Sequence, residues 1–258
     1  MESIIKKIQI AKKRLLKMHF DKKIGHIGGN LSSLDAMMVL YNNIMVDEDT
    51  FILSKGHSAG ALYIALWSIG KLSDSDLDTF HGDNTNLAGH PTAGWCQQIP
   101  ISTGSLGHGL PVAIGNALGN KLLNKPGHTY CLTSDGEWQE GSMWEALIFL
   151  AHHKLSNLTV LVDLNGLQGF GTTDEIASMS DLRNKISAFN LNVVEVDGHN
   201  PLMLQSTLEQ NKGSIIILNT TKGNGISFME NKMEWHYLPL TDDQFKLAIS
   251  EVGEPNEK

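Results

Sequence analysis

Two apolar stretches that each end in an oxygen-bearing side chain and a glycine constrain this fold most strongly. Residues 130–136 and 158–166 have this form, with Asp135 and Asn165 at their ends, and residues 142–153 between them carry a helical pattern. A strand, a helix and a strand in this length form a right-handed βαβ unit, which sets both strand ends side by side in a parallel sheet. Ligands of open α/β sheets bind at that edge.

Asp135 and Asn165 are candidate ligands of a hard cation. Asp135 offers a carboxylate and Asn165 a carbonyl oxygen, while Gly136 permits close approach of the backbone just before a helix begins. Mg²⁺ prefers a few protein oxygens completed by phosphate oxygens and water, and a helix N-terminus attracts the anion. The alternative is local: Asp135 caps the helix and Asn165 is a turn residue. Spacing alone leaves both interpretations open.

Composition excludes several classes of protein. The chain of 258 residues has 20 basic and 28 acidic residues, a net charge of −8, and no basic block after the first helix. It therefore lacks the electrostatic footprint of a nucleic-acid-binding protein. No stretch approaches 18 apolar residues, so no membrane span is expected. Cys96 and Cys131 stand alone and suit a reducing cytoplasm.

The pattern of segments predicts one α/β domain over residues 1–252 and a disordered tail over residues 253–258. Strands and helices alternate, which is typical of a doubly wound, mostly parallel sheet with helices on both faces. A second helix should begin after a cap at Ser32 and Ser33. The other expected helices cover residues 1–20, 58–69, 72–80, 113–122, 142–153, 182–189 and 201–210 and a segment after Thr241, and the strands cover residues 51–53, 130–132, 158–162, 192–196 and 214–218.

The central segment resembles the thiamine-diphosphate signature of the transketolase family. The elements Asp-Gly-Glu, Glu-Gly, Trp-Glu-Ala and Asp-Leu-Asn follow one another over residues 135–165, with Ser134 where the family usually has glycine. Four histidines also stand in contexts similar to those of the family: Gly-His-Ile-Gly-Gly, Ser-Lys-Gly-His, Gly-His-Pro and Trp-His. Each alone would be a cap, a turn or a packing residue, but their order is the family's own.

This resemblance implies a thiamine-diphosphate-binding fold that uses Mg²⁺ or Ca²⁺. It assigns the metal to Asp135, Asn165 and the carbonyl of Leu167, and the cofactor to His57, Gly104, Leu106, Asp135, Gly136, Glu137, Asn165 and His236. It implies catalytic roles for His26, His57, His90 and His236. Of these, His57 and His236 would flank the diphosphate, and His26, His90 and His236 would transfer the protons of the substrate. Imidazoles that titrate near neutral pH would suit this transfer. The roles of Glu140 and Glu145 stay open, and the glycine-rich residues 166–173 are expected to order over a ligand.

The family moves a two-carbon ketol unit from a ketose or its phosphate to an aldose. Its pyrimidine-binding domain has no counterpart before Lys258, so we expect the N-terminal subunit of a split, cytoplasmic transketolase, completed by a separate pyrimidine-binding subunit in a two-plus-two heterotetramer. Two enzyme alternatives share the signature: deoxyxylulose-phosphate-synthase-like and 2-oxoacid-dehydrogenase-like proteins. A non-catalytic regulatory subunit on the same fold is the third alternative.

Overall fold

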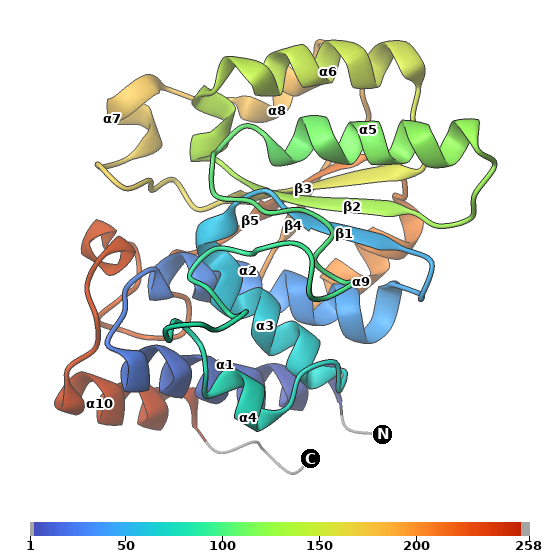
Figure 1. Cartoon of the computed structure of the whole chain (residues 1–258). Coiled ribbons are helices and arrows are strands. Elements are labelled where there is room, and N and C mark those ends of the chain that lie inside the picture. The colour runs from blue at the N-terminus through green and yellow to red at the C-terminus, as the bar shows by residue number, and fades with distance from the viewer. Residues whose placement is uncertain (1–2, 254–258) are drawn as a thin grey trace.

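A parallel sheet of five strands forms the centre of the computed structural model, which describes residues 3–253 (Figure 1). The strand order is β1-β2-β3-β5-β4, and every paired neighbour runs parallel. The doubly wound α/β prediction is confirmed, while residues 254–258 of the predicted tail lie outside the described part. The strands are β1 Thr50–Leu53, β2 Thr129–Ser134, β3 Leu158–Leu164, β4 Val193–Asp197 and β5 Ile215–Asn219.

Helices cover both faces of the sheet, as Figure 1 shows. Successive strand residues point to opposite faces, so Leu132 packs into one apolar core and Cys131 into the other. The first core contains side chains from α1 Ile4–Lys22, α2 Ile27–Val39, α3 Ala59–Ser68, α4 Asp74–Leu77, α9 Pro201–Gln210 and α10 Asp242–Val252, and the second contains side chains from α5 Gly109–Leu122, α6 Gly141–His153 and α8 Leu182–Ser187. The short α7 Thr173–Ala177 lies beyond β3. None of the described helices is long and apolar enough to cross a membrane.

The start of α2 differs from the sequence prediction. The helix begins directly after His26, so Ser32 and Ser33 lie buried inside it rather than at a cap. Both hydroxyls donate to the carbonyl of Gly29, at 3.0 and 2.9 Å, which satisfies them within the helix. A Cβ at Gly28 would stand 3.1 Å from Cγ of Lys222, so glycine here permits a close approach to the 222 loop.

Candidate active site

Asp135 and Asn165 meet at the carboxyl edge of the sheet, as the βαβ argument predicts. They follow β2 and β3, which pair directly. The Asp135 side chain is buried; its Oδ1 accepts from the N–H of Gly136 at 2.8 Å, and its Oδ2 accepts from the N–H groups of Asn165 and Gly166 at 3.0 and 2.6 Å. Asn165 Oδ1 in turn accepts from the N–H of Leu167 at 3.1 Å. The structure therefore has the feature that each interpretation requires. The local hydrogen bonds of a capping and turn site are present, and the side-chain oxygens of Asp135 and Asn165 lie at the same edge of the sheet.

The electrostatic environment of Asp135 favours a bound cation. Burial, and then the nearby charge of Asp163, raise the pKa of Asp135 to about 6, although the N–H groups of Gly166 and Gly136 oppose this shift. A positive ion beside the carboxylate would stabilise its ionised form.

A cavity of about 340 Å³ opens at this edge and gathers nearly all the predicted site residues. Its walls come from β-strand ends, the start of α2, the 3₁₀ turn at Gly56–Ser58 and the loop before α5. The predicted residues that line it are His26, His57, His90, Gly104, Leu106, Asp135, Gly136, Asn165, Leu167 and His236. Ser134 and Glu140 line it as well.

Glu137, which is predicted to bind the cofactor, is absent from the residues that line the cavity. The side chain is fully buried, and its carboxylate accepts from the Ser54 hydroxyl, from Gly107 N–H at 3.0 Å and from Ser134 N–H at 2.9 Å. These bonds join the end of β1, the loop before α5 and the end of β2. Glu137 therefore connects three segments near the cavity through hydrogen bonds, without lining the cavity itself.

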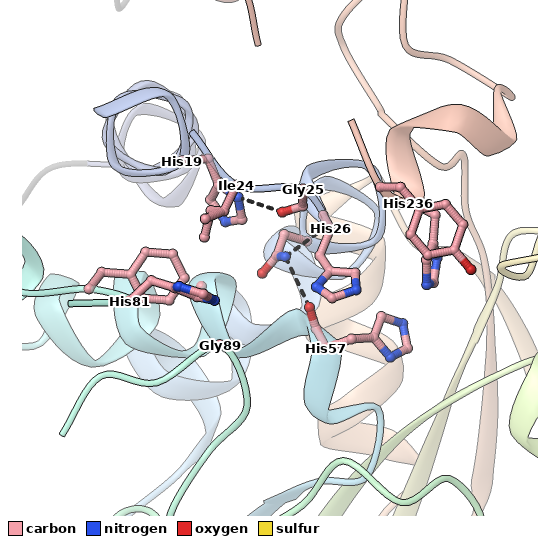
Figure 2. Close-up of a pocket in the computed structure, with 12 residues that line it drawn as sticks. His19, Ile24, Gly25, His26, His57, His81, Gly89 and His236 are labelled. Carbon is pink, nitrogen blue, oxygen red and sulfur yellow. Dashed lines mark hydrogen bonds between the residues drawn. The ribbon is translucent and has the colours of Figure 1, made fainter. Parts of the chain in front are cut away.

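Four imidazoles form a histidine cluster, which we define as His26, His57, His90 and His236. The ring centroid of His26 lies 5.8 Å from that of His57, 5.9 Å from His90 and 5.1 Å from His236. Figure 2 shows His26, His57 and His236 beside a second cavity, of about 260 Å³, that shares these three rings with the first. Four segments far apart in the sequence thus converge.

Backbone contacts hold the histidine cluster in place. His26 has the left-handed backbone conformation, with φ of 63°, and its N–H donates to the carbonyl of His236 at 3.0 Å. The Asn30 side-chain amide donates to the carbonyls of His26 and His57, at 2.8 and 3.2 Å. Asn30, in the first turn of α2, therefore holds the two segments that carry His26 and His57 at a fixed separation.

The fold lowers the pKa of all four rings of the histidine cluster, which differs from the expectation of titration near neutral pH. Burial and then the charge of His90 lower the pKa of His26 to about 4, and burial and then Lys222 lower the pKa of His236 to about 3. Burial also holds the pKa of His57 well below its usual value and lowers that of His90. Enclosure in the fold disfavours the imidazolium form.

Two lysines that sequence reasoning did not assign line the same cavity. Lys55 is 1% exposed and forms a buried ion pair with Asp163, whose carboxylate also accepts from Ser32 Oγ at 2.6 Å. Lys222 is 2% exposed, and its Nζ lies 3.3 Å from Nδ1 of His236. An aspartate inside the apolar run of β3 was an available signal, because a buried carboxylate needs a partner.

The side chains and backbone of this cavity fit thiamine diphosphate with a divalent ion. The oxygens of Asp135, Asn165 and Leu167 are the ligand type that Mg²⁺ prefers, and Lys55 and Lys222 complement a diphosphate. No described group of three His, Cys, Asp or Glu side chains is placed to hold a metal ion. Phosphate oxygens would therefore have to complete the coordination.

Comparison with known proteins identifies the family of this chain. The model of the transketolase thiamine diphosphate binding domain matches residues 5–258. The chain belongs to the transketolase family. An apulose-4-phosphate transketolase subunit of Phocaeicola vulgatus is 38% identical, over 96% of this chain and 92% of its own length. A 6-deoxy-6-sulfo-D-fructose transketolase subunit of a Clostridium species is 37% identical over 89% of this chain and 88% of its own length.

Longer transketolases contain a counterpart of this chain as one part. The transketolase structure from Leishmania mexicana superposes with a TM-score of 0.91 at 26% identity, and the match covers 100% of this chain but only 42% of that one. Human transketolase is 34% identical over 88% of this chain and 38% of its own length. The domain described here thus corresponds to less than half of these longer proteins and to nearly all of the two subunits above.

Proposed function

We propose that this chain is the diphosphate-binding subunit of a two-subunit transketolase, which transfers a two-carbon ketol unit from a ketose to an aldose. The observation that carries the proposal is one cavity that Asp135, Asn165 and all four rings of the histidine cluster line together. The chain matches the transketolase thiamine diphosphate binding domain over residues 5–258, so we interpret this cavity as the cofactor site. We call the side with Asp135 and Asn165 its charged end and the side with the histidine cluster its neutral end.

At the charged end, Asp135, Asn165 and the Leu167 carbonyl would hold Mg²⁺, or Ca²⁺, and through it the diphosphate. Gly136 leaves the backbone open beside them, and the Gly104 and Leu106 loop would contact the cofactor rings. Thiamine diphosphate supplies the carbanion chemistry of ketol transfer when bound. The residues of this chain orient it and neutralise its charge.

At the neutral end, His26, His90 and His236 would bind the hydroxyl and carbonyl oxygens of the sugar. Neutral imidazoles donate from one nitrogen and accept at the other, so they can hold a polyhydroxylated substrate and pass its protons. His57 and His236 lie near each other, at a centroid distance of 5.4 Å, and would stand between the diphosphate and the reacting carbonyl.

A separate pyrimidine-binding subunit would complete the site, in a two-plus-two heterotetramer. The relatives matched over 92% and 88% of their own length are themselves named as transketolase subunits. α6, which follows Glu140 at the cavity, exposes Ile148 and Phe149 by 61% and 42%. Such side chains suit a protein interface.

The unpaired thiols of Cys96 and Cys131 agree with a cytoplasmic location.

The substrate we propose is a sugar or a sugar phosphate. The two named subunits above act, by their names, on a phosphorylated and on a sulfonated sugar. The two lysines of the described cavity are 1% and 2% exposed and contact Asp163 and His236, so recognition of an anionic sugar terminus would fall to the partner.

Calorimetric titration of the chain with thiamine diphosphate and Mg²⁺, with and without a pyrimidine-binding subunit, tests this function. We expect binding that Asp135→Ala abolishes and that the matched exposed variant Asp83→Ala preserves. Ketol transfer should then require both subunits. Absence of binding under all conditions would contradict the proposal and favour a regulatory role, whereas decarboxylation of a 2-oxoacid would favour the other enzyme classes.

A further inference from the structure

We infer that Lys222 is a positioning residue that fixes the proton of His236 on Nε2, so that this histidine presents a hydrogen-bond donor to the cavity. The inference rests on the proposed function only for the identity of the oxygen that would accept this bond. The tautomer itself follows from the contacts of this chain and is measured without any ligand.

In the contact between these two side chains, only Lys222 can be the hydrogen-bond donor. Lys222 Nζ lies 3.3 Å from His236 Nδ1. An ammonium group has three donors and no acceptor, so Nδ1 must supply a lone pair. A neutral imidazole with a bare Nδ1 carries its hydrogen on Nε2.

Lys222 is held where this bond requires it. Its side chain is 2% exposed, and its carbonyl accepts from Asn231 N–H at 3.0 Å. The preceding N–H, of Thr221, donates to Nε2 of His199 at 2.9 Å, and the following N–H, of Gly223, donates to the carbonyl of Gly28 at 2.9 Å. The ammonium therefore has little freedom to turn away from His236.

His236 lines the cofactor cavity, and its Nε2 lies on the side of Gly169, which lines that cavity too: a Cβ built on this glycine would stand 3.4 Å from Nε2. Among the described residues, Lys222 is the one hydrogen-bond partner of a ring in the histidine cluster. Nε2–H is thus available to an oxygen that develops negative charge, for which a preorganised donor is the usual stabiliser.

Long-range ¹H–¹⁵N correlation spectra of the ¹⁵N-labelled full chain at pH 7 test this inference. The His236→Gln variant identifies the His236 signals by their loss. We expect one neutral tautomer with the hydrogen on Nε2. Lys222→Met keeps the apolar stem but removes the donor, so the Nδ1 resonance should shift and Nδ1–H should become detectable. Lys222→Arg should preserve the native pattern, as should Lys232→Met at an exposed lysine.

Two results would overturn the inference: a native His236 with its hydrogen on Nδ1, or an Nδ1 resonance that does not move in Lys222→Met. If Lys222→Met does not fold, the native spectrum still decides the tautomer, and a hydrogen on Nδ1 of His236 in Lys222→Arg, which keeps a donor, would overturn the inference. An Nε2–H tautomer in a chain without affinity for thiamine diphosphate would refute the proposed function alone, so the two failures are distinguishable.

Discussion

The two ends of the active-site cavity are built in different ways. At the charged end, Asp135 and Asn165 follow neighbouring strands, and both carboxylate oxygens of Asp135 accept hydrogen bonds from nearby backbone N–H groups. The histidine cluster draws on four distant segments, with the ring centroid of His26 5.1 to 5.9 Å from those of the other three. Asp135 and Asn165 are brought together by a βαβ unit of consecutive elements, whereas the four imidazoles are brought together by packing between distant segments.

This difference separates the expected effects of substitution. Changes at the charged end should alter folding and cofactor affinity, because buried charges depend on their partners. Changes in the neutral cluster should alter the chemical step while the cofactor still binds. The four predictions below test this division, and they begin with the largest expected effect.

Lys55→Met should destabilise the chain most. It leaves the carboxylate of Asp163, which is fully buried, without its ammonium partner. We expect the free energy of unfolding in urea to fall by about 3–5 kcal/mol, as for other broken buried pairs. The double variant Lys55→Met/Asp163→Asn should recover part of this loss. A loss below about 1 kcal/mol, the range of surface pairs, would mean that the pair is not essential to the charged end.

His26→Asn should slow turnover without weakening cofactor binding. Asparagine tolerates the left-handed backbone at φ of 63° but removes the imidazole. We expect kcat of the reconstituted pair to fall about 100-fold, the scale of a lost acid–base group. The calorimetric Kd for thiamine diphosphate should stay within about twofold, a difference below about 1 kcal/mol. His108→Asn, at an exposed position, is the control; an equal loss of cofactor affinity in His26→Asn would break the comparison.

Acidification should destabilise the chain through the histidine cluster. The pKa of His26 is about 4 in the fold against 6.5 when free, so between these values the unfolded chain binds more protons and stability rises with pH. Asp135 acts in the opposite sense, because its raised pKa of about 6 makes the folded chain bind more protons.

Urea unfolding at pH 5 and pH 7 measures this dependence. Each histidine of the cluster contributes a slope of up to about 1.4 kcal/mol per pH unit. The slope should therefore be shallower in His26→Asn and steeper in Asp135→Asn. An unchanged slope in His26→Asn would show that this imidazole titrates alike in the folded and unfolded chain.

Ser134→Gly should have the smallest effect. The serine side chain lines the cavity, but the bond that fixes this position runs from its backbone N–H to Glu137 Oε2, at 2.9 Å, and glycine keeps it. We expect a change below about 0.5 kcal/mol in stability, and a calorimetric Kd for the cofactor that changes less than about threefold. A larger change would mean that the Ser134 side chain shapes the diphosphate end.

The sequence predicted what depends on short-range order. Asp135 and Asn165 were found because one βαβ unit joins them, and α9 has the predicted bounds Pro201–Gln210. Capping and strand burial are local properties, so most other elements agree within a few residues. The family motifs then placed the four histidines on one cavity, although no local pattern connects them.

Contacts between distant segments were not predictable in this way. Lys55 and Asp163 are 108 residues apart, and Glu137 reaches Ser54 across 83. α2 continues through Gly28 and Gly29 because it packs tightly, while glycine propensity alone favours a loop. The glycine-rich segment expected to order over a ligand forms a hydrogen-bonded turn, in which Leu167 pairs with Thr172.

The hydrogen bonds of Asp135 have a consequence for how the protein acquires its cofactor. Three backbone N–H groups donate to this carboxylate, so contacts within the chain itself restrict the conformational freedom of Gly136, Asn165 and Gly166. Capture of metal and diphosphate then requires little ordering of the chain at this end. Cofactor exchange should leave the sheet edge intact, and the chain would persist as a folded receptor between encounters.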